Sequence, residues 1–213
     1  MTDLGNLQGS IMAGDRAEAV RLTQAAIDEG VAPGAILDVM TDAMRVIGRR
    51  FQANEIYVPE MLVSARAMKE ATAVLEPLLV GAGIEPLATA ILGTVKGDLH
   101  DIGKNLVGMM WKGAHLRVVD LGTNVPPERF VEAAREHHAR IIGVSALLTT
   151  TMTAMVDVVT AVRGSDVPDV KVMLGGAPVT EEFARSIGAD AYARDAGSAV
   201  EVAMAALGVG GAA

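Results

Sequence analysis

Hydrophobic positions along this chain follow two different periods, one on each side of residues 83–86. Up to about residue 82, apolar residues recur at three- and four-residue spacing, as on the buried side of amphipathic helices. From residue 87 onward, short apolar runs alternate with segments of helical spacing, which is typical of βαβ units. We therefore predict a helical domain over residues 1–85 and an α/β domain over residues 86–213.

Turn and capping residues divide the first domain into four helices. A short apolar stripe over residues 4–12 comes first, and Asp15 can cap a second helix that Gly30 ends. Pro33 and Pro59 stand where two further helices begin, because proline suits the first turn of a helix. Four antiparallel helices with short connections predict a four-helix bundle.

The second domain carries five apolar runs of strand length, each followed by a segment of helical spacing. The runs are residues 87–95, 116–121, 141–145, 170–174 and 189–192, and the helical segments are about 103–114, 126–138, 151–163, 179–187 and 197–207. Such alternation predicts a five-stranded, doubly wound parallel sheet of Rossmann-like type. The fold class is therefore α/β, with an N-terminal four-helix bundle.

Composition and charge exclude several classes of function. The net charge of -8 argues against a nucleic-acid partner, which needs a basic face for phosphates. The chain has no cysteine, which excludes disulfides, zinc–thiolate sites and iron–sulfur clusters. No apolar run reaches the roughly 18–20 residues of a membrane span, and the N-terminus does not resemble a signal peptide. We expect a cytoplasmic protein with no membrane partner.

Candidate chemistry is concentrated in Gly93–Asn105, which reads GTVKGDLHDIGKN and joins the first strand to the next helix. Ligands of open α/β sheets bind at the carboxyl ends of strands, where this loop lies. Its pattern Asp-x-His-x-x-Gly is formed by Asp98, His100 and Gly103. One ring nitrogen of a histidine can bind a metal while the other donates to a carboxylate, and a glycine lets a bulky group approach the backbone. The same spacing also occurs by chance around surface histidines.

Two further loops at the same edge of the predicted sheet carry candidate contacts. Ser145, Thr149 and Thr151 follow the third strand, and their hydroxyls either cap the next helix or bond a buried polar ligand. Gly175 and Gly176 follow the fourth strand, and they either form a tight turn or let a ligand approach the backbone. The residues alone leave both pairs of alternatives open.

These three loops resemble, in the same order, the cobalamin-binding domain of corrinoid methyltransferase proteins, the family that includes the cobalamin module of methionine synthase. In that family the Asp-x-His-x-x-Gly loop is joined by Ser-x-Leu after the third strand and Gly-Gly after the fourth. Ser145-Ala146-Leu147 and Gly175-Gly176 stand in those positions. The helical domain resembles the family's helical cap, above all over Tyr57–Ala71, so the likeness covers nearly the whole chain.

The resemblance implies a role for each matching residue. His100 is expected to be the lower axial ligand of cobalt, in place of the cofactor's own base, whose tail enters a channel beside the sheet. Asp98 is expected to hydrogen-bond the far ring nitrogen of His100, and the hydroxyl of Thr151, where the family has a serine, to bond Asp98. The residues expected to contact the cobalamin are Asp98, Leu99, His100, Asp101, Ile102, Gly103, Ser145, Leu147, Thr149, Thr151, Gly175 and Gly176.

The implied function is that of a methyl carrier loaded with methylcobalamin or a related corrinoid. It would shuttle a methyl group from a donor-specific methyltransferase to a second methyltransferase acting on a thiol or a folate. A reductive activation protein is a further expected partner, and the chain would be the methyl-carrying subunit of the system. The helical cap would move about residues 83–86 to admit both partners. Tyr57 and Met61 either shield the upper face of the corrin or pack in the bundle.

Three other functions stay open on the sequence. A cobalamin-binding sensor would share the site but is expected to add a DNA-binding segment. A small subunit of an adenosylcobalamin mutase would share the histidine loop but is expected to lack the helical cap. A protein-interaction module without any cofactor also stays open, because a fold does not fix a function.

Overall fold

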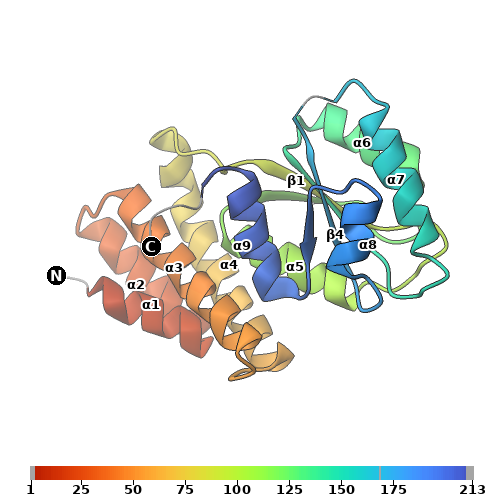
Figure 1. Ribbon diagram of the computed structural model, residues 1–213. Coiled ribbons are helices and arrows are strands. Elements are labelled where there is room, and N and C mark those ends of the chain that lie inside the picture. Colours follow the sequence, from red (N-terminus) through yellow and green to blue (C-terminus); the bar gives the residue numbers. More distant parts are fainter. Residues whose placement is uncertain (1–2, 168, 210–213) are drawn as a thin grey trace. The chain divides into compact units, whose positions relative to one another are not determined.

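The computed structural model describes residues 3–167 and 169–209, which form two compact units (Figure 1). One unit holds the described residues up to Pro86 together with Gly113–His115, and the other holds Leu87–Lys112 and the described residues from Leu116 onward. The first unit consists of helices, and the second alternates strands with helices around one sheet. The predicted α/β class is therefore confirmed. Within the described residues, no helix combines the length and the apolar character that crossing a membrane requires.

The first unit contains four helices that pack against one another. They are α1 (Leu4–Ala13), α2 (Arg16–Asp28), α3 (Pro33–Gln52) and α4 (Val58–Gly81). The side chain of Asp15 accepts a hydrogen bond from the Glu18 N–H at 3.0 Å, which fixes the start of α2 as predicted. The apolar stripes of the four helices meet in a core that includes Leu7, Ile11, Ile36, Met40, Met44, Ile47, Met61 and Leu75.

Tyr57 and Met61, two candidates for shielding a cofactor, lie in different surroundings. Met61 is buried in the core of the bundle, with an exposed fraction of 1%, which favours the packing alternative for this residue. Tyr57 stands before the first turn of α4 and is 66% exposed, although it carries a large apolar ring. A shielding role stays a prediction for Tyr57.

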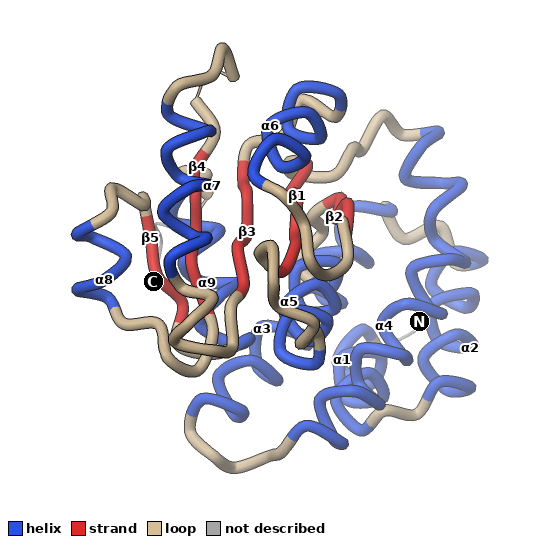
Figure 2. Tube along the Cα trace, turned by 90° about the vertical axis from the view of Figure 1, so that its right-hand side faces the viewer, coloured by secondary structure: helices blue, strands red, loops and turns tan. Residues whose placement is uncertain are grey.

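The second unit is built on one parallel sheet. Its strands are β1 (Thr89–Thr94), β2 (Arg117–Asp120), β3 (Ile141–Ser145), β4 (Lys171–Gly175) and β5 (Ala191–Ala193), in the order β2-β1-β3-β4-β5 (Figure 2). Every neighbouring pair is parallel, as the sequence predicts. The ends of the strands differ from the predicted ones by at most two residues.

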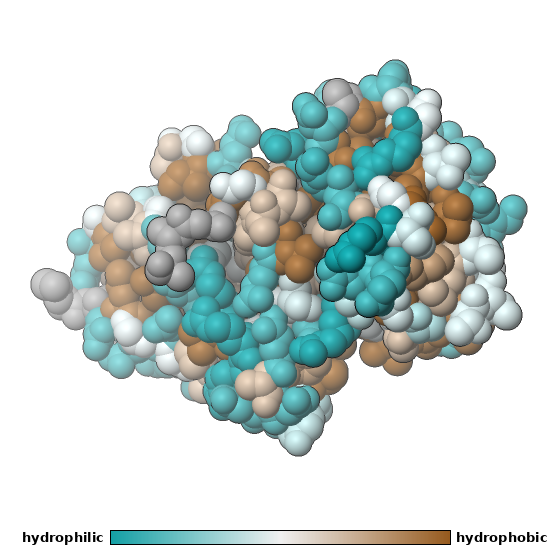
Figure 3. All heavy atoms as spheres, viewed as in Figure 1, coloured by the Kyte–Doolittle hydropathy of each residue, from teal (hydrophilic) through white to brown (hydrophobic). Residues whose placement is uncertain are grey.

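Helices cover both faces of this sheet. They are α5 (Ile102–Gly113), α6 (Pro127–Glu136), α7 (Thr153–Arg163), α8 (Glu181–Ser186) and α9 (Ala196–Ala206). On one face, α6 and α7 bury Phe130 and Met155 against β1 and β3. On the other, the Trp111 indole of α5 donates to the carbonyl oxygen of Ala199 in α9 at 3.0 Å. The outer side of α8 is hydrophilic (Figure 3).

The strand order places three loops at one edge of the sheet. Thr94, Ser145 and Gly175, the last residues of β1, β3 and β4, are neighbours in register. Because β2 is added on one side of β1 and β3 on the other, the order in which strands are added reverses between β1 and β3. Ligands of open α/β sheets bind at such a switch point, outside the carboxyl ends of the strands. The loops after β1 and β3 are thus where a ligand site is expected.

Candidate functional site

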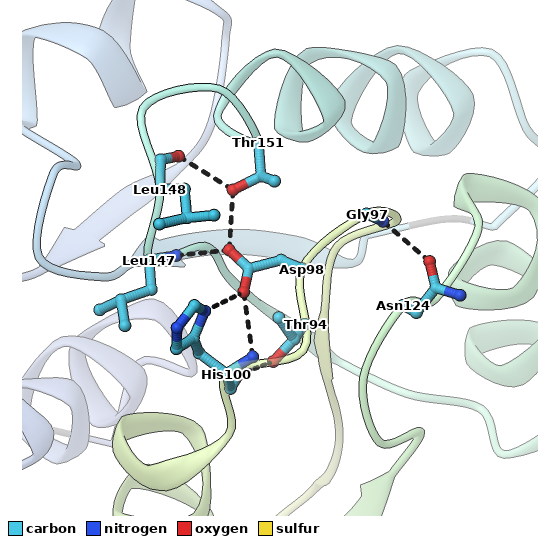
Figure 4. Close-up of polar contacts among 8 residues, drawn as sticks. All are labelled: Thr94, Gly97, Asp98, His100, Asn124, Leu147, Leu148 and Thr151. Atoms are coloured by element: carbon cyan, nitrogen blue, oxygen red, sulfur yellow. Dashed lines mark hydrogen bonds and ion pairs between the residues drawn. The ribbon is translucent and has the colours of Figure 1, made fainter.

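The carboxylate of Asp98 is the centre of the site (Figure 4). One oxygen, Oδ1, accepts from the His100 backbone N–H at 3.0 Å and lies 2.7 Å from Nδ1 of the His100 ring. The other, Oδ2, accepts from the Leu147 N–H and from the Thr151 hydroxyl, both at 2.7 Å. The predicted hydrogen bonds of Asp98 with His100 and with Thr151 are therefore both present. They join the loop after β1 to the loop after β3.

The electrostatics of this cluster fix its protonation. Burial of Asp98 on its own would raise the pKa of its carboxyl. The hydrogen bonds from Leu147, His100 and Thr151 outweigh burial and hold the pKa of Asp98 well below its ordinary value. An ionised carboxylate only accepts hydrogen bonds, so the shared proton belongs to Nδ1 of His100. In a neutral ring, Nε2 is then the nitrogen with the free lone pair.

His100 is half exposed and stands among uncovered apolar side chains. The exposed fraction of its side chain is 49%, and within the described residues its Nε2 has no hydrogen-bond partner. Leu99 and Ile102 on either side of it are 74% and 76% exposed. Leu147 and Leu148 from the loop after β3 are 42% and 44% exposed. Exposed apolar side chains on the two loops that meet at an available imidazole nitrogen make this place a candidate binding site for a large ligand.

Space is also open beside the first turn of α5. A Cβ atom placed on Gly103 would meet nothing within 4 Å, so this glycine is not required by packing of the protein. Asp101, just before the helix, accepts from the side-chain amide of Asn105 at 3.0 Å. Packing within the described residues therefore leaves the space beside Gly103 open.

The other predicted contacts lie at the same ends of the strands and, within the described residues, make no hydrogen bond to Asp98 or His100. Ser145 is partly buried and Thr149 is exposed, and within the described chain neither hydroxyl makes a hydrogen bond to protein. Gly176 has φ +132°, and a Cβ atom there would stand 1.8 Å from the carbonyl oxygen of Ala146. This contact supports the tight-turn interpretation of Gly176, since the neighbouring backbone already occupies the space.

Two residues that hold the histidine loop were not predicted from the sequence. The hydroxyl of Thr94, buried at the end of β1, donates to the His100 carbonyl oxygen at 2.9 Å. The side chain of Asn124 accepts from the Gly97 N–H at 2.8 Å (Figure 4). A hydroxyl at the end of a buried strand needs a partner, and that was the available signal for Thr94. For Asn124 the signal was an asparagine in a short loop after a strand.

Comparison with known families shows which family the chain belongs to. A family model described as B12 binding domain matches residues 88–204, more than half of the chain. The chain belongs to this B12-binding family. A second model with the same description matches residues 5–76, within the helical unit. The resemblance drawn from the sequence is thus confirmed, and cobalamin is the cofactor of this B12-binding protein.

Curated relatives match over nearly the full length of the B12-binding chain. A corrinoid protein of Desulfitobacterium hafniense (strain Y51) is 38% identical over 98% of this chain and 99% of its own. Trimethylamine corrinoid protein 2 of Methanosarcina mazei is 36% identical over 97% of both chains. Together with the family models, they place the chain among the corrinoid proteins of methyltransferase systems.

Solved structures agree with the curated relatives. The crystal structure of a cobalamin-binding protein from Desulfitobacterium hafniense DCB-2 has a TM-score of 0.82 and 26% identity, covering 97% of this chain and 99% of that one. A chain of the methanol:cobalamin methyltransferase complex from Methanosarcina barkeri has a TM-score of 0.83 and 28% identity, covering 96% of this chain and 79% of that one.

The residues at the sheet edge fit a corrinoid. A macrocycle brings four ligands of its own to the metal, so a single nitrogen from the protein would suffice, and His100 Nε2 has no hydrogen-bond partner within the described residues. Exposed apolar side chains at positions 99, 102, 147 and 148 suit the apolar face of a large ring. The open space at Gly103 allows the ring to approach the helix. Among the residues with this fit, only the histidine offers a nitrogen ligand.

Proposed function

We propose that this B12-binding protein is a methyl carrier that holds its cobalamin base-off, with His100 as the lower axial ligand of cobalt. It takes a methyl group from a donor-specific methyltransferase and presents it to a second methyltransferase that acts on a thiol or a folate. The cobalt of the bound cofactor supplies the methyl-accepting and methyl-donating chemistry, as cofactors usually do. The protein supplies binding, orientation and tuning of the axial ligand.

The observation that carries the proposal is the state of the His100 imidazole. Nδ1 is tied to a buried, ionised Asp98 at 2.7 Å, while the half-exposed ring leaves Nε2 available. A carboxylate on the far nitrogen fixes the tautomer and raises the basicity of the metal-binding nitrogen. Thr151 and the Leu147 N–H hold the carboxylate in turn, at 2.7 Å each. Each group thus has a defined part in keeping one nitrogen ready for cobalt.

The remaining site residues are assigned to the body and the tail of the cofactor. Leu99, Asp101, Ile102 and Gly103 would lie under the corrin ring, on the open side of the histidine loop. The tail, with its displaced base, would run past the loops after β3 and β4. The residues assigned to this channel are Ser145, Leu147, Thr149, Gly175 and Gly176. Residues 1–85 would act as a cap over the upper face and move about the 83–86 segment.

The names of the relatives support the assignment of partners. Relatives of similar identity are named trimethylamine and dimethylamine corrinoid proteins, at 36% and 40%. A solved neighbour is a methanol:cobalamin methyltransferase complex. Because chains that share one fold are named for different donors, we place the choice of donor on the partner methyltransferase. A reductive activation protein and a cytoplasmic location complete the proposal.

The helical unit favours a carrier over a mutase subunit. A B12-binding model matches residues 5–76, and the four helices of this unit form their own buried core. A small subunit of an adenosylcobalamin mutase is expected to lack such helices. The charge of -8 disfavours a DNA-binding regulator.

Ligation by His100 is tested by electron paramagnetic resonance of the cobalt(II) form. Protein grown with 15N-labelled histidine is loaded with unlabelled cobalamin. If His100 binds cobalt, the nitrogen splitting changes from a triplet to a doublet, because the nuclear spin of nitrogen falls from 1 to 1/2. His100→Ala loses the effect of the label, whereas His137→Ala, at the end of α6, keeps it. A triplet that ignores the label would show the cofactor's own base still on the metal.

Methyl transport is tested separately. The reduced, loaded protein is mixed with one donor at a time, namely methanol, a methylamine, a methoxylated aromatic or a quaternary amine, together with its methyltransferase. We expect one pairing to methylate the cofactor, as followed by absorbance, and an acceptor methyltransferase to reverse the change. Failure of every pairing, with ligation intact, would contradict the carrier function but not the binding site.

A further inference from the structure

Asn124, in the loop between β2 and α6, makes two hydrogen bonds to the loop that carries His100. Its backbone N–H donates to the Asp98 carbonyl oxygen at 2.9 Å. Its side-chain oxygen accepts from the Gly97 N–H at 2.8 Å (Figure 4). Asn124 therefore bonds both the backbone N–H of Gly97 and the backbone carbonyl oxygen of Asp98. Both hydrogen bonds use backbone groups of Gly97 and Asp98, so they involve no side chain that is proposed to contact the cofactor.

The backbone of Asn124 has a conformation that few residue types adopt. Its φ is +55°, in the left-handed region, where asparagine is found far more often than other residues with a Cβ atom. This conformation turns the main-chain N–H and the side-chain oxygen of the same residue toward the neighbouring loop. The asparagine is exposed, so burial of the side chain does not explain why it stands here.

The loop that carries Asn124 is itself firmly held. The Thr94 N–H donates a hydrogen bond to the Gly122 carbonyl oxygen at 3.0 Å, and the Val125 N–H donates to the Thr94 carbonyl oxygen at 2.9 Å. At the base of the loop, Asp120 accepts from the Gly122 N–H at 2.9 Å and from the buried ammonium group of Lys104 at 2.5 and 2.6 Å. Lys104 belongs to the first turns of α5, so the loop is fixed to the helix that follows His100.

Asp98 is consequently fixed from two directions. Its carboxylate is held by the loop after β3, through Leu147 and Thr151. Its main chain is held by the loop after β2, through Asn124. With either hold missing, the carboxylate could rotate or the loop could shift, and both movements would change where the His100 ring stands.

We propose that Asn124 is a positioning residue, which sets the place of the His100 imidazole through the main chain of Gly97 and Asp98. The inference rests on the proposed function insofar as it concerns cobalt. The part that concerns the placing of Asp98 and His100 holds in the protein without cofactor.

The test uses two substitutions at this position. Asn124→Gly tolerates the positive φ but removes the side-chain acceptor, and Asn124→Asp keeps an oxygen at the same place. In the cofactor-free protein, Asn124→Gly should speed hydrogen exchange of the Gly97 amide about tenfold and shift the 15N signal of His100 Nδ1. In the loaded protein, the affinity for cobalamin should fall about five- to tenfold, as for loss of one neutral hydrogen bond. Asn124→Asp should keep the wild-type exchange of Gly97, the wild-type 15N signal of His100 and most of the affinity for cobalamin.

A matched control exists in the other unit. Asn54 is also exposed and has φ +57°, but it lies between α3 and α4, and within the described residues it makes no hydrogen bond to the histidine loop. Asn54→Gly should leave the exchange of Gly97, the His100 signal and the affinity unchanged. Equal values for the wild type and Asn124→Gly in all three measurements would overturn the proposal. So would equal losses in Asn124→Gly and Asn54→Gly.

Ligation of cobalt by His100 and positioning of His100 by Asn124 can fail independently. If labelled histidine does not change the splitting of the cobalt(II) resonance in the wild type, the proposed ligation fails. Hydrogen exchange of the Gly97 amide and the 15N signal of His100 in the cofactor-free protein still decide the role of Asn124. If ligation holds and Asn124→Gly leaves those signals unmoved, the positioning role fails and the proposed function stands.

Discussion

Two loops at the same edge of the sheet are built in opposite ways. The loop after β1 surrounds a polar centre at Asp98, leaves His100 half exposed, and has open space at Gly103. The loop after β4 is packed backbone against backbone, with the Cβ position of Gly176 only 1.8 Å from the Ala146 carbonyl oxygen. The first loop presents chemical groups, and the second closes the fold beside it.

The difference shows that glycines of two neighbouring loops can serve different needs. Gly103 has no neighbour within the described residues that would exclude a methyl group, so packing of the protein does not require its small size. Gly176 combines φ +132° with contact to main-chain atoms, so the protein itself requires it. Four substitutions, ordered by the size of their expected effect, test this contrast.

Gly176→Ala should have the largest effect. The added Cβ atom would overlap the Ala146 carbonyl oxygen, which belongs to backbone and cannot swing away. We expect a loss of at least about 4 kcal/mol in the free energy of unfolding, measured by urea denaturation of the cofactor-free protein. Gly188→Ala is the control, because φ is +78° there but nothing lies within 4 Å, and it should cost about 1 kcal/mol. Equal costs at the two sites would remove the packing role of Gly176.

Asp98→Asn should have the next largest effect, roughly 2–4 kcal/mol at neutral pH, because a buried carboxylate with several donors is replaced by an amide. The pKa of Asp98 is lower in the folded than in the unfolded protein, so its stabilisation is complete above the unfolded value of about 3.9. It is lost as the pH falls through the folded pKa.

The stability difference between wild type and Asp98→Asn should therefore shrink as the pH is lowered from about 4. Urea denaturation at pH 7, 4 and 3 measures it. Asp38→Asn, at an exposed carboxylate of α3, controls for removal of one charge. A difference that stays constant over this range would contradict the lowered pKa of Asp98.

Thr151→Val should have a smaller effect, about 1–2 kcal/mol, because it removes one donor to Asp98 and keeps the volume of the side chain. The 15N signal of His100 Nδ1 should shift as its carboxylate partner moves. Thr151→Ser keeps the hydroxyl and should retain the signal. If serine disturbs the signal as much as valine does, the hydroxyl by itself does not hold Asp98 in place.

Gly103→Ala should have the smallest effect on folding and the opposite sign. Alanine in the first turn of α5 should stabilise the cofactor-free protein by roughly 0.5 kcal/mol, since its Cβ atom meets nothing. The same methyl group should weaken cobalamin binding, measured by titration. Gly9→Ala in α1 also meets nothing and should give a similar gain without any change in binding. Unchanged binding in Gly103→Ala would mean that no ligand uses the open space.

The sequence alone determined the elements, the order of the domains and the central pair of the site. Hydrophobic period is a local property, so the helices and strands could be located to within two residues in the second unit. Asp98 and His100 are two residues apart, and a spacing this short leaves the carboxylate and the ring within reach of each other. Thr151, by contrast, was assigned from the resemblance to a family.

Only the tertiary structure decided what lies opposite these residues. Asn124 is distant in sequence from Gly97, and its bond depends on β2 lying beside β1 in the sheet. The backbone N–H of Leu147, which holds Asp98, carries no sequence signal because every residue but proline has that donor. That packing requires a glycine at position 176 became clear only from the position of the Ala146 carbonyl oxygen. Contacts between loops arise from strand order, and strand order is a property of the assembled sheet.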